Sequence, residues 1–179
     1  AAGFLIEKEI QYLGKLLKNP EKPFIAILGG AKVSDKMGIL KNLTGRLQKI
    51  IIGGGMAYTF IKAQGNNIGS SKLENDSIPT AKSILNDKNI KVILPIDHIA
   101  AEKIDAEAPS RIIDGNNIPN GWIGLDIGPK TRELFKKELA EAKTIIWNGP
   151  LGMFELPQFM EGTSEIAEFI TGLNAATVI

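Results

Sequence analysis

The chain has 179 residues, 44% of them hydrophobic and 23% charged, which is enough apolar material for one compact domain with a substantial core. Its 21 basic and 20 acidic residues give a formal charge of +1, so electrostatics favour neither nucleic acid nor a membrane as a partner. The sequence contains no cysteine, which excludes disulfides, thiolate nucleophiles and cysteine zinc sites and fits a cytoplasmic location. Because the net charge is close to zero, any phosphate binding must depend on a local group of residues.

The first segment carries an apolar residue at every third or fourth position from Ile6 to Leu17 and predicts an amphipathic helix over residues 1–19. Residues 24–28 follow as a short continuous apolar run. Such a run is typical of a strand buried on both faces of a parallel sheet and is far too short to span a membrane. Two glycines end this strand, and Ser34 is a suitable N-terminal residue for the helix that follows.

The same unit of strand, glycine turn and helix recurs along the rest of the chain. Further strands are predicted at 49–52, 90–94, 123–127, 144–147 and 176–179, and further helices at 56–64, 76–85, 131–142 and 163–170. Residues 97–122 are polar and rich in turns, and within them only 111–113 indicate a minor strand. The alternation predicts an α/β fold with a mainly parallel sheet, whose ligands bind beyond the carboxyl ends of the strands.

The turn after the first strand, Gly-Gly-Ala-Lys-Val-Ser-Asp-Lys at 29–36, lies between a strand and a helix. Free backbone N–H groups and the helix dipole can face an anion there, and glycines let a phosphate approach the main chain. Lys32 and Lys36 are four positions apart, which puts them near one helical face, where two ammonium groups are favourable only if an anion joins them. We interpret both as phosphate ligands; the alternative is a pair of ordinary surface lysines.

The glycines at 53–55 follow the second predicted strand in the same way. Neither common nucleotide signature is present, because the first turn lacks the GxxxxGK[ST] order and the second has Tyr58 where GxGxxG needs its last glycine. A tight strand-to-helix turn is the alternative use of these glycines. Spacing alone is therefore insufficient to assign a ligand to them.

A third loop, Trp-Asn-Gly-Pro-Leu-Gly-Met-Phe-Glu at 147–155, follows another buried strand. The carboxylate of Glu155 can accept both hydroxyls of a ribose, and Met153 and Phe154 offer apolar surface to a base. The alternative is a solvated Glu155 beside a core Phe154.

The polar segment 97–122 contributes no catalytic group in this interpretation. His98, the only histidine, is predicted to be structural because no partner ligand lies near it in the sequence. Asp97 is predicted to cap a helix or turn instead of taking part in catalysis.

Five stretches, in order along the chain, resemble phosphoglycerate kinase. They are GFLIEKE at 3–9, AILGGAKVSDK at 26–36, IIGGGMA at 51–57, GLDIGP at 124–129 and WNGPLGMFE at 147–155. The match runs nearly from end to end, and five long motifs in order are far more specific than one glycine-rich match. The chain resembles the C-terminal, nucleotide-binding half of that family.

The resemblance implies a Rossmann-like three-layer α/β/α sandwich with a six-stranded, mainly parallel sheet in the order 3-2-1-4-5-6. It divides the chain into an interdomain-type helix over 1–19 and a nucleotide-binding domain over 20–179. The family transfers the acyl phosphate of 1,3-bisphosphoglycerate to Mg-ADP and forms 3-phosphoglycerate and ATP in glycolysis. The resemblance thus implies a monomeric cytoplasmic enzyme that binds ADP or ATP, with Mg²⁺, on this domain.

The resemblance also assigns roles to individual residues. Lys32 would stabilise the phosphoryl group in flight, and Lys36 would hold nucleotide phosphates. Asn148 would approach the phosphates, and Glu155 would bind the ribose. The other expected nucleotide contacts are Gly30, Ala31, Gly53, Gly54, Leu73, Gly124, Pro150 and Met153.

Two features of the family are expected outside this sequence. A Gly-Gly-Gly-Asp loop, whose Asp holds Mg²⁺, is expected after the strand that ends at Ile179, so no metal ligand is expected in this chain. The N-terminal domain that binds 3-phosphoglycerate or 1,3-bisphosphoglycerate is also expected elsewhere, so the fragment alone should bind ADP or ATP without turnover. There are two rival interpretations. One is a dinucleotide-dependent dehydrogenase, but this sequence lacks the GxGxxG motif that such an enzyme needs. The other is a non-catalytic nucleotide-sensing module.

Overall fold

A computed structural model describes residues 19–43 and 45–179 of the chain, and the helix predicted over 1–19 therefore lies outside the described residues except for its last position. The strands are β1 (Phe24–Leu28), β2 (Lys49–Ile52), β3 (Lys91–Ile93), β4 (Asp97–Ala101), β5 (Ser110–Asp114), β6 (Ile123–Ile127), β7 (Thr144–Asn148) and β8 (Ala176–Val178). The α-helices are α2 (Met37–Leu43), α3 (Ala57–Ala63), α4 (Ile78–Leu85), α5 (Pro129–Leu139) and α6 (Glu161–Thr171), and short 3-10 helices are η1 (Ser34–Lys36), η2 (Asn75–Ser77) and η3 (Pro157–Phe159).

The main sheet has five strands in the order β3-β2-β1-β7-β8, and all of its paired neighbours are parallel. The prediction of an α/β fold with a mainly parallel sheet is confirmed. The prediction of six strands in the order 3-2-1-4-5-6 is wrong, because β6, expected as the fourth strand, is not part of this sheet. Both edges of β1 are already paired, one with β2 and the other with β7, so β6 has no place beside it.

A second sheet has the antiparallel order β5-β4-β6, and β6 pairs with β4. Sequence analysis missed β4, because its first two residues are the polar Asp97 and His98. Both side chains are nevertheless fully buried and hydrogen-bonded, so the strand is an interior one that does not have an apolar pattern. The minor strand expected at 111–113 is present within β5.

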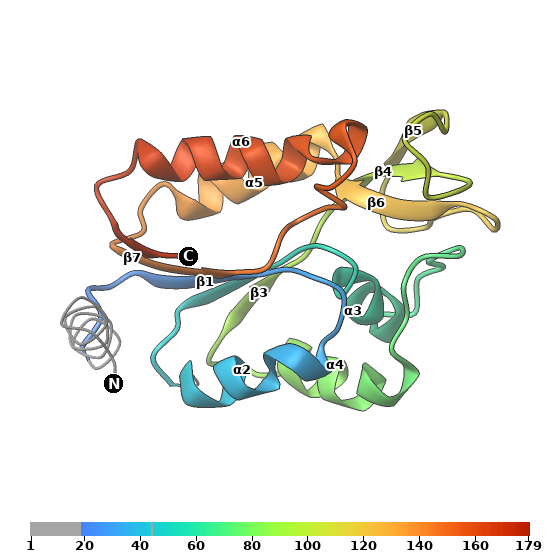
Figure 1. Ribbon diagram of the computed structural model, residues 1–179. Coiled ribbons are helices and arrows are strands. Elements are labelled where there is room, and N and C mark those ends of the chain that lie inside the picture. The colour runs from blue at the N-terminus through green and yellow to red at the C-terminus, as the bar shows by residue number, and fades with distance from the viewer. Residues whose placement is uncertain (1–18, 44) are drawn as a thin grey trace, which may run out of the picture.

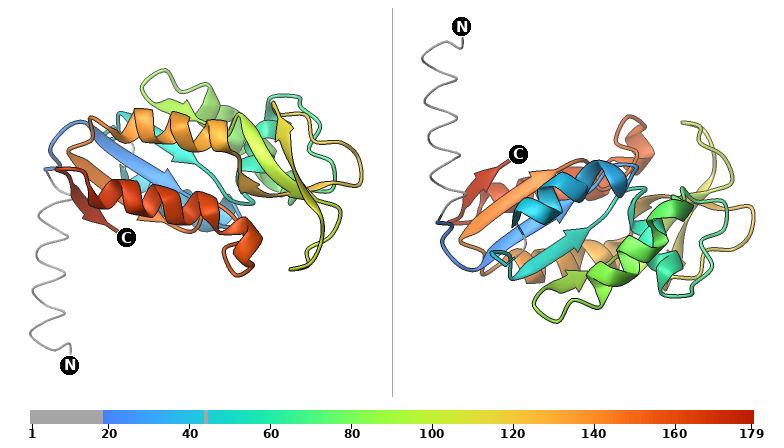
Figure 2. Two further views of the ribbon diagram at one scale, coloured as in Figure 1. Left: turned by 90° about the horizontal axis from the view of Figure 1, so that it is seen from above. Right: turned by 90° about the horizontal axis from the view of Figure 1, so that it is seen from below.

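Helices cover both faces of the main sheet, with α5 and α6 on one face and α2, α3 and α4 on the other (Figures 1 and 2). Strand β1 shows how the sequence builds these layers. Its alternate residues Phe24, Ala26 and Leu28 belong to one core cluster, and Ile25 and Ile27 belong to the other. Because successive side chains of a strand point to opposite faces, a strand covered on both sides must be apolar at every position.

The antiparallel sheet lies beyond the carboxyl ends of β1 and β7 (Figure 1). The chain thus has a boundary between two sheets at the edge where α/β proteins bind their ligands. Within the described part of the chain, no helix is both long and apolar enough to cross a membrane.

Candidate functional site

The turns that follow β1, β2 and β7 pack directly against one another through their main chains. The N–H of Gly30 donates to the carbonyl of Pro150 at 2.8 Å, and the N–H of Gly54 donates to the carbonyl of Leu151 at 2.9 Å. A Cβ at Gly54 would lie 2.6 Å from the nitrogen of Gly30, and one at Gly29 would lie 2.0 Å from the oxygen of Pro150. These positions therefore require glycine because the main chains come so close together. For Gly54 this agrees with the tight-turn alternative, and it holds whether or not a ligand binds there.

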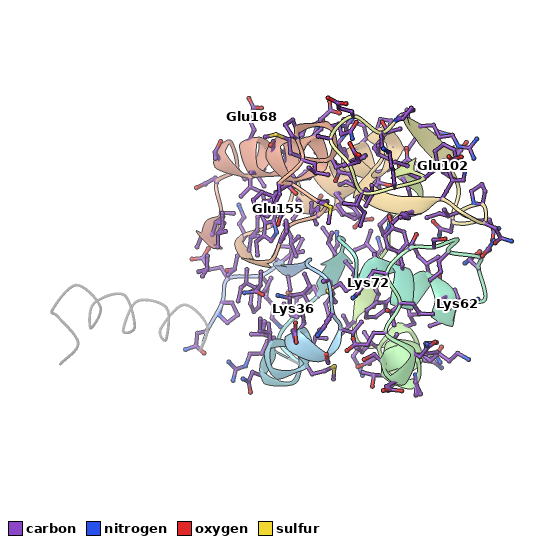
Figure 3. The ribbon with its side chains drawn as sticks, turned by 45° about the vertical axis from the view of Figure 1, so that its right-hand side comes forward. Lys36, Lys62, Lys72, Glu102, Glu155 and Glu168 are labelled. Carbon is purple, nitrogen blue, oxygen red and sulfur yellow. The ribbon has the colours of Figure 1, made fainter. Side chains whose placement is uncertain are left out.

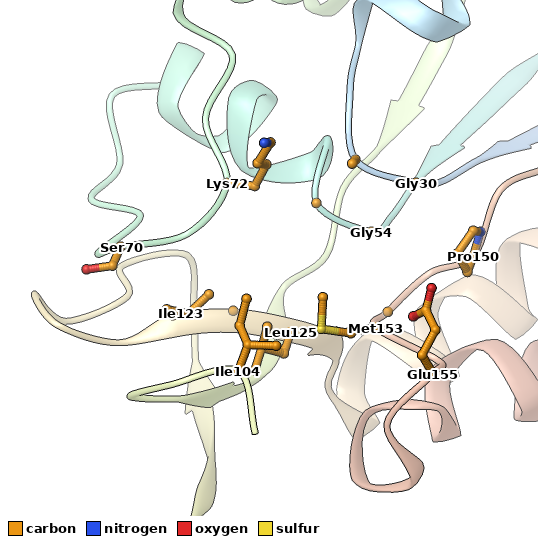
Figure 4. A pocket seen from close by; sticks show the side chains of 14 residues that line it. Gly30, Gly54, Ser70, Lys72, Ile104, Ile123, Leu125, Pro150, Met153 and Glu155 are labelled. Atoms are coloured by element: carbon orange, nitrogen blue, oxygen red, sulfur yellow. The ribbon is translucent and has the colours of Figure 1, made fainter. Parts of the chain in front are cut away.

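A cavity of about 480 Å³ opens between these turns and the antiparallel sheet (Figure 4). Its lining includes seven residues that the resemblance assigns to a nucleotide: Gly30, Ala31, Gly54, Gly124, Pro150, Met153 and Glu155. We call the side formed by the turns after β1, β2 and β7 the glycine wall, and the side formed by β6 with Ile104 the strand wall. A volume of this size suits a small organic ligand.

Five expected nucleotide contacts do not line the cavity: Lys32, Lys36, Gly53, Leu73 and Asn148. Gly53 is buried behind the glycine wall, where an added Cβ would meet the side chain of Leu151 at 2.4 Å. Leu73 is half-buried and packs against the core cluster on the α3 side of the sheet. Its neighbour Lys72 lines the cavity instead.

Sequence analysis missed several lining residues: Gly55, Ser70, Lys72, Ile104, Ile123, Leu125 and Gly152. Ser70, Lys72 and Ile104 belong to irregular segments, in which no periodicity marks a residue as facing a ligand. Ile123 and Leu125 belong to a run that predicts a strand of the parallel sheet. Only the position of β6 in the second sheet turns part of that strand toward the cavity.

The two lysines of the first turn occupy different positions. Lys32 is exposed on the turn before η1, and Lys36 is the last residue of η1. Lys36 Nζ donates a hydrogen bond to Oδ1 of Asn148, and its Cε lies 3.7 Å from the place of a Cβ on Gly30. Figure 3 shows Lys36 beside the blue helix and Glu155 beside the loop before α6. This lysine–asparagine contact adds a side-chain link to the main-chain hydrogen bonds between these two segments.

The loop after β7 presents a carboxylate and an apolar side chain to the cavity. Glu155 is exposed and also lines the cavity, so it is a solvated acid with access to a ligand. Met153 lines the cavity while packing against a small core cluster, and its N–H donates to the carbonyl of Leu125 at 2.8 Å. Phe154 is 48% exposed, so the alternative in which it is a core residue is wrong.

Buried polar side chains support the strand wall from behind. Asp97 accepts hydrogen bonds from the N–H groups of Lys130 at 2.9 Å and Thr131 at 2.7 Å. It therefore caps the start of α5, in agreement with its predicted capping role. His98 lies between the hydroxyl of Tyr58 and Oδ1 of Asn116, each at 3.3 Å. Burial lowers the pKa of His98, and a hydrogen bond to Asn116 partly opposes that shift. The predicted structural role of His98 is confirmed.

Burial also raises the pKa of the Tyr58 phenol, with a smaller contribution from the charge of Asp126. The hydroxyl lies 2.0 Å from the place of a Cβ on Gly124, so the tyrosine fills the space directly under this part of the strand wall. Gly124 N–H donates to Oγ of Ser71 at 2.9 Å on the same side. Gly124 is therefore the residue type that lets Tyr58 and β6 approach each other.

Fold and cavity define this chain as an α/β protein with a ligand-sized cavity at the carboxyl edge of a parallel sheet. The family model for phosphoglycerate kinase matches residues 1–179, and the chain belongs to this family. A phosphoglycerate kinase of Limosilactobacillus reuteri subsp. reuteri is 54% identical over 179 residues, which are 100% of this chain and 44% of that protein. One from Koribacter versatilis is 54% identical over 183 residues and 45% covered.

Solved structures agree with this assignment. The phosphoglycerate kinase of Coxiella burnetii superposes with a TM-score of 0.93 at 37% identity, over 98% of this chain and 46% of that one. The phosphoglycerate kinase of Pyrococcus horikoshii superposes with a TM-score of 0.80 at 29% identity, over 97% of this chain and 45% of that one. The chain therefore spans less than half the length of the relatives that it matches.

Proposed function

We propose that this chain is the nucleotide-binding half of a phosphoglycerate kinase, which transfers the acyl phosphate of 1,3-bisphosphoglycerate to Mg-ADP and yields 3-phosphoglycerate and ATP. One observation carries the proposal: seven residues assigned from the sequence, which come from four separate segments of the chain, line a single cavity. Monomeric state and cytoplasmic location belong to the same proposal.

The cavity has the residue types that a nucleoside diphosphate needs at its two ends. The Met153 side chain and Leu125 offer apolar contact to a base, and the Glu155 carboxylate can accept hydrogen bonds from ribose hydroxyls. Gly30, from the turn after β1, lets phosphate oxygens come close to the main chain. Lys36 beside that turn supplies a cation for the phosphates.

Phosphoryl transfer depends on in-line positioning and charge neutralisation, and it needs no protein nucleophile. In the proposal Lys36 holds phosphates of the bound nucleotide, and Lys32, exposed on the same turn, stabilises the phosphoryl group as it moves. Among residues 19–43 and 45–179 no group of three or more His, Cys, Asp or Glu could hold a metal ion. In the proposal magnesium enters as part of the Mg-nucleotide.

The 179-residue chain by itself is proposed to bind ADP or ATP without turnover, because it spans 44% of the length of a curated relative. Calorimetric titration with ADP, and separately with NAD, tests this assignment against the dehydrogenase alternative. ADP should bind and NAD should not. Binding of NAD without ADP would remove the proposal.

Glu155→Gln tests the orientation of the nucleotide in the cavity. The substitution should weaken ADP by roughly 1 to 2 kcal/mol, because a charge-assisted hydrogen bond to ribose becomes a neutral one while the shape is kept. Adenine alone should bind both proteins equally, since it has no ribose. An equal loss of adenine and ADP affinity would mean that Glu155 contributes only packing.

A further inference from the structure

A buried carboxylate lies directly behind the cavity. Asp126 is on β6, next to the lining residue Leu125, and is 2% exposed. Its Oδ2 accepts a hydrogen bond from the N–H of Gly162 at 2.8 Å, and its Oδ1 accepts one from its neighbour Ile127 at 2.8 Å. Since Gly162 is in the first turn of α6, the carboxylate ties the strand wall to the start of that helix.

The segment between β7 and α6 carries the lining residues Pro150, Gly152, Met153 and Glu155. Asp126 reaches this segment as well, because a Cβ at Gly152 would lie 2.2 Å from Oδ1 of Asp126. The carboxylate thus occupies the space under Gly152.

Two further hydrogen bonds hold the first part of this loop. The N–H of Met153 donates to the carbonyl of Leu125 at 2.8 Å. The N–H of Leu151 donates to Oγ1 of Thr163 at 3.0 Å, and Thr163 is the neighbour of Gly162 on α6. The loop is therefore held against β6 and α6 together, and the Asp126 side chain hydrogen-bonds from β6 to the start of α6.

We infer that Asp126 is a positioning residue for the nucleotide site, whose ionised carboxylate holds β6 and the start of α6 together and so places the loop that carries Met153 and Glu155. The inference rests on the proposed function, because it assigns a role to Asp126 in binding the same nucleotide. Asp126 itself does not contact the ligand in this assignment.

The charge of Asp126 changes with pH, and the surroundings of the carboxyl group set the pH at which it changes. Burial raises its pKa to about 6, against the lowering effects of the Gly162 and Ile127 N–H groups and of Arg132 on α5. The carboxylate of Glu161, at the start of α6, adds a smaller raising effect, and Tyr58 of α3 faces the same group. A protonated carboxyl has one strong acceptor oxygen left, so two N–H donors can no longer both be well satisfied.

The test compares the parent chain with Asp126→Asn by calorimetric titration with ADP from about pH 8 to about pH 5. An amide has the shape of the acid with one acceptor oxygen, so Asp126→Asn should bind ADP about five-fold more weakly at the upper pH. Both proteins should lose some affinity as the terminal phosphate of ADP takes up a proton at about pH 6, and the parent should lose a further, similar factor that the variant does not lose. Asp114→Asn, at an exposed site on β5, is the matched control and should behave like the parent.

Parental affinity and a parental pH profile in Asp126→Asn would overturn the inference while leaving the proposed function intact. Failure of the parent to bind ADP at all would instead count against the proposed function, and this inference would fall with it. Should Asp126→Asn not fold, Thr163→Val tests the other tether, since it removes the hydroxyl that accepts from Leu151 and leaves the carboxylate in place. Unchanged ADP affinity in a folded Thr163→Val would overturn the proposed positioning.

Discussion

The two walls of the cavity are built from different materials. The glycine wall is main chain, in which the turns after β1, β2 and β7 hydrogen-bond to one another at 2.8 to 2.9 Å without intervening side chains. The strand wall is one face of β6, and it is held in place by the buried polar side chains of Asp97, His98 and Asp126 on β4 and β6. One wall thus depends on the absence of side-chain atoms and the other on the charge and hydrogen bonding of particular side chains.

This difference determines what each wall tolerates. Packed main chains cannot move apart without losing their hydrogen bonds, so even one added carbon is costly there. Buried polar groups tolerate changes of size better than loss of a partner, because an unsatisfied donor or acceptor carries its full desolvation cost. Substitutions on the two walls should therefore differ in both size and pH dependence.

The largest effect is expected from Gly54→Ala in the glycine wall. Gly54 has a φ of +63, and its added Cβ would lie 2.6 Å from the nitrogen of Gly30 and 2.7 Å from the oxygen of Pro150. Left-handed backbone and main-chain overlap together should lower the free energy of unfolding by about 4 kcal/mol and abolish ADP binding. Urea unfolding and ADP titration measure the two effects.

Gly121→Ala is the control for backbone conformation alone. Gly121 has a φ of +82, and its added Cβ would meet nothing within 4 Å. It should cost about 1 kcal/mol, the strain of the left-handed region by itself. Equal losses for the two variants would show that the packing between the turns contributes nothing.

The second effect concerns the support of the strand wall. Asp97→Ala removes the acceptor for the N–H groups of Lys130 and Thr131 and for the Thr131 hydroxyl, all buried or partly buried at the start of α5. The free energy of unfolding should fall by about 3 kcal/mol, since three donors lose their partner. ADP affinity of the folded fraction should change little, because Asp97 caps α5 and no residue of that helix lines the cavity. A loss of affinity larger than the loss of stability would place Asp97 in the site itself.

The same contrast explains what the sequence could predict. Continuous apolar runs such as 24–28 identify strands that are buried on both faces, and glycines after them mark the carboxyl edge of the sheet. The motif resemblance then assigned seven lining residues. The strand β4 was missed because Asp97 and His98 are satisfied by Thr131, Tyr58 and Asn116, which are distant in sequence. Pairing of β6 with β4 instead of β1 is a tertiary choice that no local pattern encodes.

A third, intermediate effect is the pH dependence of the contribution that Asp126 makes to the free energy of unfolding. This contribution changes with pH in the direction opposite to that of usual acid denaturation. The folded chain keeps the Asp126 proton up to about pH 6, whereas an ordinary carboxyl releases it near 3.8. Between these values the unfolded state binds fewer protons, so this group's contribution to stability falls as the pH rises. Relative to Asp126→Asn, the parent should lose on the order of 2 to 3 kcal/mol between about pH 4 and about pH 7.

The comparison of parent and variant isolates this contribution from the rest of the chain. Glu138 has its pKa lowered by hydrogen bonds from Lys49 and Lys91, so its contribution is lost as the pH falls. That contribution is present in both proteins and cancels in their difference. Denaturant unfolding at each pH should therefore give a rising difference in favour of Asp126→Asn, and a constant difference would contradict the burial of an ionisable Asp126.

The smallest effect separates the two lysines that flank the cavity. Lys36 does not line the cavity, but it lies beside Gly30 of the glycine wall, where the phosphates are proposed to lie, and is hydrogen-bonded to Asn148. Lys72 lines the cavity from the segment after α3, and Figure 4 shows it across from Glu155.

Lys36→Met should weaken the affinity for ADP about ten-fold, because it removes one charge-assisted contact while keeping most of the apolar stem of the side chain. Lys72→Met should change ADP affinity less than about two-fold, because an exposed ammonium that is not in contact with phosphate is screened by water and salt. Titration of both variants with ADP and with adenosine sharpens the comparison, since adenosine has no phosphate and should bind Lys36→Met as it binds the parent. If Lys72→Met lost more ADP affinity than Lys36→Met, the phosphates would lie on the α3 side, and the glycine wall would hold the nucleoside instead.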